Sequence, residues 1–303
     1  DRLWVTVYHT DDQAATLWKK IARLDDRRIL RIATEDNFWS MGETGPCGPC
    51  SEIFYDHGPH LQGGLPGTPD QDGDRYVELW NMVFMQYNQL DLNHRKSLSA
   101  MSIDTGMGLE RMAAVLQGVD DNFDTDLFVP LIRQSRAQVG TDGQGAVLSH
   151  RVIADHVRSS SFLIADGVMP SNEGRGYVLR RILRRALRHV HLMGGGKDHL
   201  VNVSGVLVDQ MRDIYPQLVQ SRAMISAVLR EEAVRFHDLL HKGLCLLDQW
   251  VAEVNGHGLF PGQKAFQLYD TYGFPLDLTQ DILKERGVFV NEKEFQDCMN
   301  QQK

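Results

Sequence analysis

The chain has 303 residues, of which 42% are hydrophobic and 24% are charged, and its formal net charge is −8 at pH 7. This composition is typical of a globular protein, and no apolar run approaches the roughly 20 residues of a membrane-spanning helix, so we expect no membrane partner. The acidic balance excludes generic polyanion binding, so any nucleic-acid contact must come from a local basic patch. Four cysteines do not suggest a disulfide scaffold, which favours a cytoplasmic location.

The first 118 residues are predicted to contain mostly strands. The predicted strands cover Leu3–Tyr8, Ile29–Ile32, Glu52–Asp56 and Tyr76–Tyr87. Thr10 is predicted to cap a short helix, with Asp11 and Asp12 in its first turn. Asp36–Ser51 is rich in glycine and proline and is predicted to be a loop. Because these strands follow one another with few helices between them, an antiparallel sheet with helices packed on it is favoured.

After about Gly118 the apolar residues adopt the three- and four-residue spacing of amphipathic helices. The predicted helices cover Phe123–Val139, His150–Ala165, Arg175–Met193, Val201–Ile214, Ile225–Val254, Lys264–Tyr269 and Leu278–Arg286. We therefore expect an α+β fold with two domains, residues 1–118 and residues 119–303, the second almost wholly helical.

The segment Ser102–Arg111 carries the most informative pattern, Ser-Ile-Asp-Thr-Gly-Met-Gly-Leu-Glu-Arg. A strand is predicted to pass through a tight turn flanked by Gly106 and Gly108 and then to enter a helix. The first N–H groups of such a helix form an anion site, and Arg111 adds a forked cation suited to phosphate oxygens. Asp104 supplies a carboxylate that could hold an ammonium group. A glycine turn before a surface helix is the alternative explanation.

Three other features of the first half allow more than one interpretation. Cys47 and Cys50 form a Cys-x-x-Cys pair that could be a zinc half-site, a redox pair or part of a rigid turn. No second Cys-x-x-Cys pair is present in the sequence, so we favour the turn. Trp39 is either a core residue or the wall of a small-molecule pocket. Asn81, between apolar neighbours, is either a satisfied buried amide or a ligand contact. Strand alternation predicts that Glu78, Trp80 and Met82 point one way and that Leu79, Asn81 and Val83 point the other.

An arginine-rich helix is predicted at Arg175–Met193. Arg180, Arg184 and Arg188 recur every four residues and share one stripe, while Arg181 and Arg185 begin the next. A solvated helix face is one explanation. Like charges at this spacing repel each other, however, and the helix offers few acidic partners of its own, so we favour contact with an external polyanion.

Together these residues resemble the alanyl-tRNA synthetases, a family of class II aminoacyl-tRNA synthetases. Asp-Thr-Gly-Met-Gly-Leu-Glu-Arg resembles class II motif 3 in its alanine-specific form, and Gly-Pro-Cys-Gly-Pro-Cys and Asn-Glu-x-Arg-Gly-Tyr-Val-Leu-Arg-Arg also match. The matching stretches are Asp36–Gly42, Thr44–Asp56, Glu78–Asn88, Ser102–Gln117, Asp155–Arg188 and Leu268–Pro275. The resemblance implies part of a class II antiparallel sheet with flanking helices, followed by a helical tRNA-recognition domain.

The resemblance implies a two-step ligase reaction. Alanine and ATP, the latter as its Mg²⁺ complex, give alanyl-adenylate and pyrophosphate, and the alanyl group then passes to the 3′ end of tRNA(Ala). The residues implied in alanine binding are Asp104, Asn81, Trp39, Val83 and Gly106. The residues implied in ATP binding are Arg111, Gly108 and Glu78, with Arg111 on the phosphates. A pocket shaped for a methyl group excludes larger side chains but rejects glycine only weakly.

In the helical half, Asn172 and Asp270 match the family positions that read the G·U wobble pair of the tRNA(Ala) acceptor stem. The remaining residues implied in tRNA contact are Arg175, Arg180, Arg181, Arg184 and Arg188. Class II motifs 1 and 2 and the zinc-containing editing domain are not recognised in this chain, so we expect an internal fragment that is inactive alone. A non-catalytic tRNA-binding module is the alternative.

Overall fold

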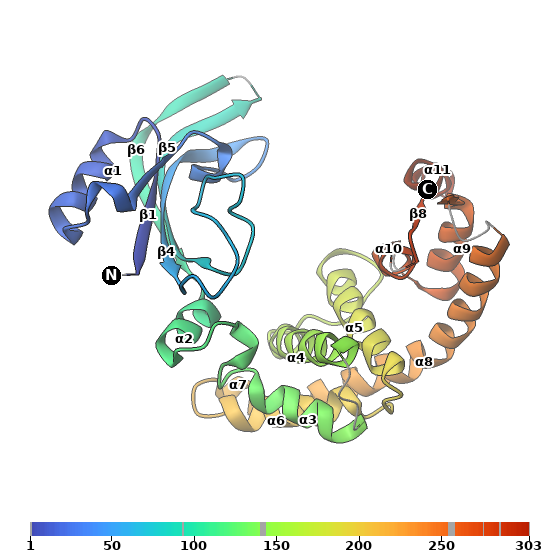
Figure 1. Ribbon diagram of the computed structural model, residues 1–303. Coiled ribbons are helices and arrows are strands. Elements are labelled where there is room, and N and C mark those ends of the chain that lie inside the picture. Colours follow the sequence, from blue (N-terminus) through green and yellow to red (C-terminus); the bar gives the residue numbers. More distant parts are fainter. Residues whose placement is uncertain are drawn as a thin grey trace. The chain divides into compact units, whose positions relative to one another are not determined.

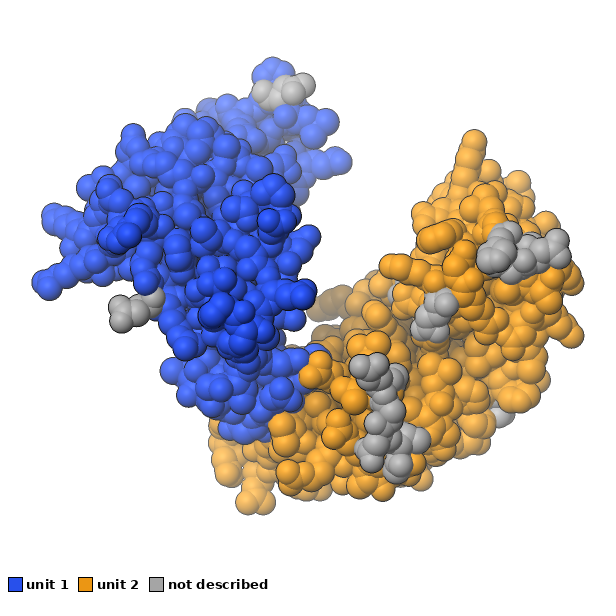
Figure 2. All heavy atoms as spheres, viewed as in Figure 1, with its two compact units in different colours: residues 1–127 blue, residues 128–303 orange. Residues whose placement is uncertain are grey.

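The computed structural model describes residues 2–92, 94–139, 144–253, 258–274, 276–284 and 286–302. The chain divides into two compact units, residues 1–127 and 128–303 (Figure 2). The first is built on a mainly antiparallel sheet and the second on helices, which confirms the predicted α+β class (Figure 1). No helix among these residues is both long and apolar enough to cross a membrane. The first unit runs to Leu127, beyond the predicted boundary at Gly118.

Six strands form the sheet of the first unit. Their bounds are β1 Leu3–Tyr8, β2 Ile29–Ile32, β3 Phe38–Ser40, β4 Gly45–Asp56, β5 Tyr76–Asp91 and β6 His94–Met107. The order is β2-β1-β4-β5-β6, and β3, which lies outside this order, pairs with β4. β1 and β2 run parallel, and the other pairs run antiparallel. The antiparallel core of this sheet agrees with the sequence prediction.

Two glycine-rich segments that were predicted as a loop and a turn are strand instead. β4 begins at Gly45, so the predicted loop over Asp36–Ser51 is wrong for its second half. A Cβ on Gly48 would lie 1.9 Å from the carbonyl oxygen of Phe84 in β5, so glycine here permits close approach of two strands. β6 likewise runs through Gly106, and Gly108, with φ −71°, leads directly into helix α2, Leu109–Gln117. The predicted tight turn is therefore absent from this described segment.

One face of the sheet is covered by α1, Asp12–Leu17 (Figure 1). Ala14 and Ala15 pack with Val7 in a buried cluster. The helix is capped by Asp11, whose Oδ1 accepts the N–H of Ala14 at 2.8 Å, and not by Thr10 as predicted. Thr6, Glu52 and Asn81 lie on the opposite face of the sheet.

The second unit is helical, with one short two-stranded parallel ladder. Its helices are α3 Val129–Val139, α4 Gln144–Ala165, α5 Gly174–Leu192, α6 His199–Met211, α7 Pro216–Gln220, α8 Arg222–Glu253, α9 Gly262–Tyr272, α10 Leu276–Lys284 and α11 Glu292–Gln302, and the ladder joins β7 Gly258–Phe260 to β8 Val288–Val290. The predicted helix at Phe123 starts six residues later, because Asp121 caps a separate 3₁₀ turn at Asn122–Asp124. The ladder and α11 were not predicted.

Candidate functional site

A row of four residues crosses the face of the sheet opposite α1. Thr6 of β1 lies opposite Glu52 of β4, Glu52 lies opposite Asn81 of β5, and Asn81 lies opposite Gly106 of β6. Residues that pair directly across strands point to the same face. The sheet register therefore gathers Asn81 and Gly106, which are far apart in sequence, with two residues that the sequence analysis did not select.

The neighbouring row brings in the other predicted alanine contacts. Val83 of β5 lies opposite Asp104 of β6, two residues along from the first row. Val83 is buried, whereas Asp104 is exposed and its Oδ1 accepts the N–H of Thr105 at 2.9 Å. Trp39, which is 37% exposed, belongs to β3 and pairs with Gly48 of β4. Asn81, Val83, Asp104 and Gly106 thus share one face of β5 and β6, whereas Trp39 lies on β3, on the other side of β4.

Glu52 is the functional candidate that the sequence analysis missed. Its side chain is only 8% exposed, and Oε2 accepts a hydrogen bond from the hydroxyl of Thr6 at 3.1 Å. Burial, with the nearby negative charge of Glu78, raises the pKa of Glu52 to about 7, and the Thr6 hydrogen bond opposes this rise. The glutamate in the predicted strand Glu-Ile-Phe-Tyr-Asp could have indicated this site, because a carboxylate is rarely buried in a protein unless it is paired.

Glu52 also fixes the side chain of Asn81. Nδ2 of Asn81 donates to Oε1 of Glu52 at 3.3 Å. Oδ1 of Asn81 is buried and has no hydrogen-bond partner among the described residues. A buried acceptor without a partner is costly unless a ligand or water satisfies it. The amide therefore presents a carbonyl oxygen that could accept a hydrogen bond from an ammonium group.

Glu78 and Arg111 lie beside this group. A register shift in β5 places Glu78 opposite Phe54, so it shares a face with Asn81, whereas strand alternation predicted opposite faces. Nη1 of Arg111 donates to the carbonyl oxygen of Glu78 at 2.7 Å and lies 3.5 Å from its carboxylate. Both residues line a cavity of about 530 Å³, and Asp104 is not among the described residues that line it.

Two expectations about the same region need correction. The N–H of Gly108 donates to the carbonyl oxygen of Leu79 at 3.1 Å, so this group is not available to a phosphate. Cys47 and Cys50 are buried free thiols in β4, and burial raises the pKa of Cys50 to about 12, which makes it a poor nucleophile. No group of three or more His, Cys, Asp or Glu residues in the described parts of the chain could hold a metal ion. Both cysteines lie in a strand and not in the predicted turn.

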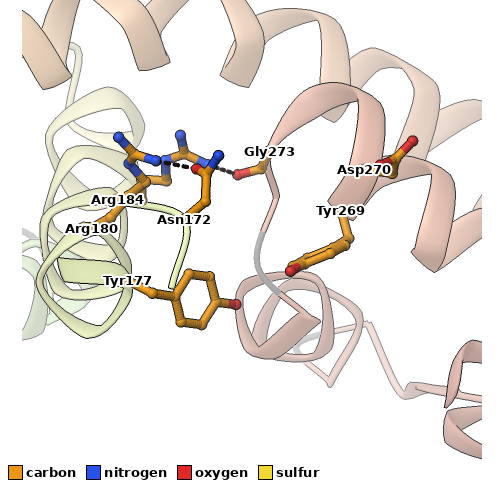
Figure 3. Close-up of a pocket in the computed structure, with 7 residues that line it drawn as sticks. All are labelled: Asn172, Tyr177, Arg180, Arg184, Tyr269, Asp270 and Gly273. Atoms are coloured by element: carbon orange, nitrogen blue, oxygen red, sulfur yellow. Dashed lines mark hydrogen bonds between the residues drawn. The ribbon is translucent and has the colours of Figure 1, made fainter. Parts of the chain in front are cut away.

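The second unit contains a separate cavity of about 260 Å³ (Figure 3). It is lined by Asn172, Tyr177, Arg180, Arg184, Tyr269, Asp270 and Gly273. Asn172 precedes α5 and Asp270 belongs to α9, so the fold brings these two predicted residues to one site. In Figure 3 the hydroxyls of Tyr177 and Tyr269 are directed towards each other, whereas the carboxylate of Asp270 points away from Asn172.

The arginine stripe of α5 does not face solvent as predicted. Arg180 forms an ion pair with the buried Glu232 of α8, at 3.3 Å. Arg184 lies over the ring of Phe236 at 5.2 Å and donates to the carbonyl oxygen of Gly273, and burial lowers its pKa. Arg188 is only 4% exposed, so it is not available for direct phosphate contact. Glu232 and Phe236 of α8 are partners of Arg180 and Arg184, and sequence spacing within α5 could not show them. Among the five arginines predicted to contact tRNA, Arg175 and Arg181 are exposed.

Comparison with known proteins gives a consistent family. The model of the family described as tRNA synthetases class II (A) matches residues 1–303. The alanine–tRNA ligase of Caulobacter vibrioides is 59% identical over 304 residues, a match that covers 100% of this chain and 34% of that protein. Those of Paramagnetospirillum magneticum and Rickettsia felis are 59% and 57% identical, again over the whole chain and 34% and 35% of the relative. The chain spans about a third of the length of these curated relatives. It therefore belongs to the family of class II (A) tRNA synthetases.

Proposed function

We propose that this chain carries the alanine-binding and acceptor-stem-binding residues of an alanine–tRNA ligase. The reaction is the ATP-dependent activation of alanine to alanyl-adenylate and transfer of the alanyl group to the 3′ end of tRNA(Ala), in the cytoplasm. The observation that supports this most is the shared face of Asn81, Val83, Asp104 and Gly106, beside the cavity lined by Glu78 and Arg111. Relatives named alanine–tRNA ligase, 56–59% identical over the whole chain, support the choice of amino acid.

In this proposal the sheet face recognises alanine by charge and size. The Asp104 carboxylate and the unpaired Oδ1 of Asn81 accept hydrogen bonds from the alanine ammonium group. Val83 and the side-chain-free Gly106 leave room for a methyl group and little more. The amino acid is thereby held by its ammonium end, so its carboxylate is free to attack the α-phosphate of ATP.

The nucleotide occupies the neighbouring cavity. Arg111 is already held by Glu78, which directs its guanidinium along the cavity wall. A guanidinium pairs with phosphate oxygens through two parallel hydrogen bonds and offsets the charge that develops as pyrophosphate leaves. Mg²⁺ arrives with ATP as part of the substrate, and Glu78 is the acidic side chain nearest to Arg111 that could contact it.

The helical unit binds the acceptor stem of tRNA(Ala) in this proposal. Asn172 and Asp270 line one cavity and supply an amide and a carboxylate, which are suited to base edges in a minor groove. Arg175 and Arg181 are exposed on α5 and suited to backbone phosphates. The G·U wobble pair of the stem is the feature that Asn172 and Asp270 would read.

The test is alanine-dependent exchange of pyrophosphate into ATP by a ligase of the relatives' length that carries this sequence. Arg111→Ala should abolish exchange while thermal stability stays close to that of the parent, since this side chain is about half exposed. Near-normal exchange in that variant would remove Arg111 from the phosphate site. A parent protein without alanine-dependent exchange would contradict the proposed activity.

The chain spans only about a third of the length of its relatives, which supports a second candidate function. The 303 residues alone could be a tRNA-binding module without catalytic activity. We expect the isolated chain to bind acceptor-stem RNA and not to form adenylate. Adenylate formation by the isolated chain would rule out this second function.

A further inference from the structure

Arg180 is held by three acceptors, two from the segment that precedes α5 and one from α8. Nη1 donates to Oδ1 of Asn172 (Figure 3). Nη2 donates to the carbonyl oxygen of Pro170 at 3.3 Å and to Oε1 of Glu232 at 3.3 Å. Its side chain is 15% exposed, so the guanidinium is occupied by protein groups and largely shielded from solvent. These contacts leave Arg180 poorly placed to neutralise an RNA phosphate.

Glu232 anchors this arrangement from α8. The residue is 4% exposed, and its Oε2 has no hydrogen-bond partner among the described residues. A buried carboxylate with so few partners depends on opposite charge beside it, and here Arg180 forms the ion pair while Arg184 also interacts electrostatically with Glu232. The ion pair therefore holds the guanidinium at one place, 52 residues away along the chain.

We propose that Arg180 and Glu232 form a positioning pair that orients the amide of Asn172 for an RNA base edge, and that Arg180 is not a phosphate contact. This inference rests on the proposed role of Asn172 in reading the acceptor stem. Because Arg180 binds the amide oxygen, the amide must turn its N–H donors outward to the cavity. The site therefore presents a hydrogen-bond donor that suits an acceptor such as a pyrimidine O2 in the minor groove.

The geometry of arginine is required for this role. A guanidinium donates from Nη1 and Nη2 in fixed directions, so it can bind Asn172 and Glu232 at once. The single ammonium of lysine keeps the charge but cannot hold both partners in the same directions. Arg180→Lys thus separates the two explanations, since a phosphate contact survives this change far better than a positioning contact.

The experiment measures the affinity of the 303-residue chain for two RNA hairpins over a series of salt concentrations. One hairpin has a G·U pair in the stem, and the other has a G·C pair at the same position. Arg180→Lys should lower the preference for G·U by roughly tenfold, the effect of one lost base contact. It should leave the slope of log K against log salt concentration unchanged. Arg181→Ala is the matched comparison: losing one phosphate contact should reduce that slope by about 0.7–0.9 and keep the preference.

Glu232→Gln gives an independent measure because it keeps the side-chain volume and one acceptor oxygen. Its G·U preference should fall between that of the parent and that of Arg180→Lys, with the salt slope again unchanged. Parental preference in Arg180→Lys or in Glu232→Gln would overturn the positioning role. A lower salt slope in Arg180→Ala, with equal losses on both stems, would show a phosphate contact and also overturn it. Equal binding of both stems by the parent would instead contradict the proposed function on which the inference rests.

Discussion

The side-chain amide of Asn81 donates to Oε1 of Glu52 across 3.3 Å, between neighbouring strands of the sheet. The other carboxylate oxygen of Glu52, Oε2, accepts a hydrogen bond from the hydroxyl of Thr6, so both carboxylate oxygens of Glu52 are hydrogen-bonded. The arrangement leaves Oδ1 of Asn81 as a buried acceptor without a hydrogen-bond partner among the described residues. Glu52 thus acts on the proposed alanine site through Asn81 without touching the substrate.

Replacing Glu52 should therefore affect alanine binding selectively. In a ligase of the relatives' length that carries this sequence, Glu52→Ala should raise the KM for alanine by about tenfold, because the Asn81 amide loses its orientation. The KM for ATP should change little. Glu52→Gln keeps an acceptor oxygen and should stay close to the parent. In a double-mutant cycle, Glu52→Ala should add little to Asn81→Ala, and additive losses would contradict the coupling.

Asp104 offers a test of the ammonium site itself. Asp104→Asn keeps the shape of the side chain and the oxygen that accepts the N–H of Thr105, so the fold should be preserved. Loss of a charge-assisted hydrogen bond should raise the KM for alanine by roughly 10- to 100-fold. Pyrophosphate exchange measured over alanine and ATP concentrations checks this, and a KM for alanine that matches the parent's would exclude Asp104 as the ammonium partner.

The buried carboxylate of Glu52 also predicts how stability depends on pH. Its pKa is about 7 in the folded protein and 4.5 in the reference state, so the folded state binds the proton more tightly. The free energy of unfolding should therefore fall as pH rises from about 4.5 to 7, by roughly 3 kcal/mol at most from this group. Glu52→Gln removes that contribution and should flatten the dependence.

Tryptophan fluorescence during urea unfolding can follow this effect in the first unit. Four of the five tryptophans lie there, at positions 4, 18, 39 and 80. Parent and variant share every other titratable group, so the difference between their pH profiles isolates Glu52. Equal slopes between pH 5 and pH 8 would show that the Glu52 carboxylate is not buried in the folded protein.

The candidate site residues could be selected from the sequence, but the groups that pack against them could not. Asp104, Asn81 and Arg111 were selected from short motifs, and the strand register then brought Asp104 and Asn81 to one face. The shift that moves Glu78 to this face depends on the pairing of β5 with β4, which no local pattern contains. The arginine stripe was misread because its acidic partner, Glu232, lies 52 residues from Arg180. Local spacing shows which residues share a helix face and cannot show what packs against that face.

Replacement by alanine should have different effects on stability at two glycines of the first unit. Gly48→Ala should destabilise the first unit by about 3 kcal/mol or more, because the new Cβ would lie 1.9 Å from the backbone oxygen of Phe84. Gly106→Ala has no heavy atom within 4 Å of the new Cβ and should change stability by less than about 1 kcal/mol. The added methyl still projects from the face that carries Asn81, so Gly106→Ala should raise the KM for alanine by about tenfold. Urea unfolding and pyrophosphate exchange test both variants, and a stable Gly48→Ala protein would contradict the close strand contact.

In the second unit, a buried pair of imidazoles predicts the reverse pH dependence. Oγ of Ser135 lies 2.7 Å from Nε2 of His199 and 2.8 Å from Nδ1 of His150, and all three side chains are buried. Burial, with the nearby His150, lowers the pKa of His199 from 6.5 to about 4. The unfolded state therefore binds the proton more readily between these values, and the free energy of unfolding should fall as pH drops from about 6.5 to 4.

His199→Gln tests this because glutamine can still hydrogen-bond to Ser135 but does not titrate. Circular dichroism at a helix-sensitive wavelength follows unfolding of the helical unit, where most of the chain's helices lie. The parent should lose roughly 3 kcal/mol at most between pH 6.5 and pH 4 through His199, and the variant should lose less over the same interval. Any acid sensitivity that remains in the variant comes from other groups. An equally steep loss in both proteins would mean that His199 is able to take up a proton without unfolding, and the buried Ser135 contact would then not constrain it.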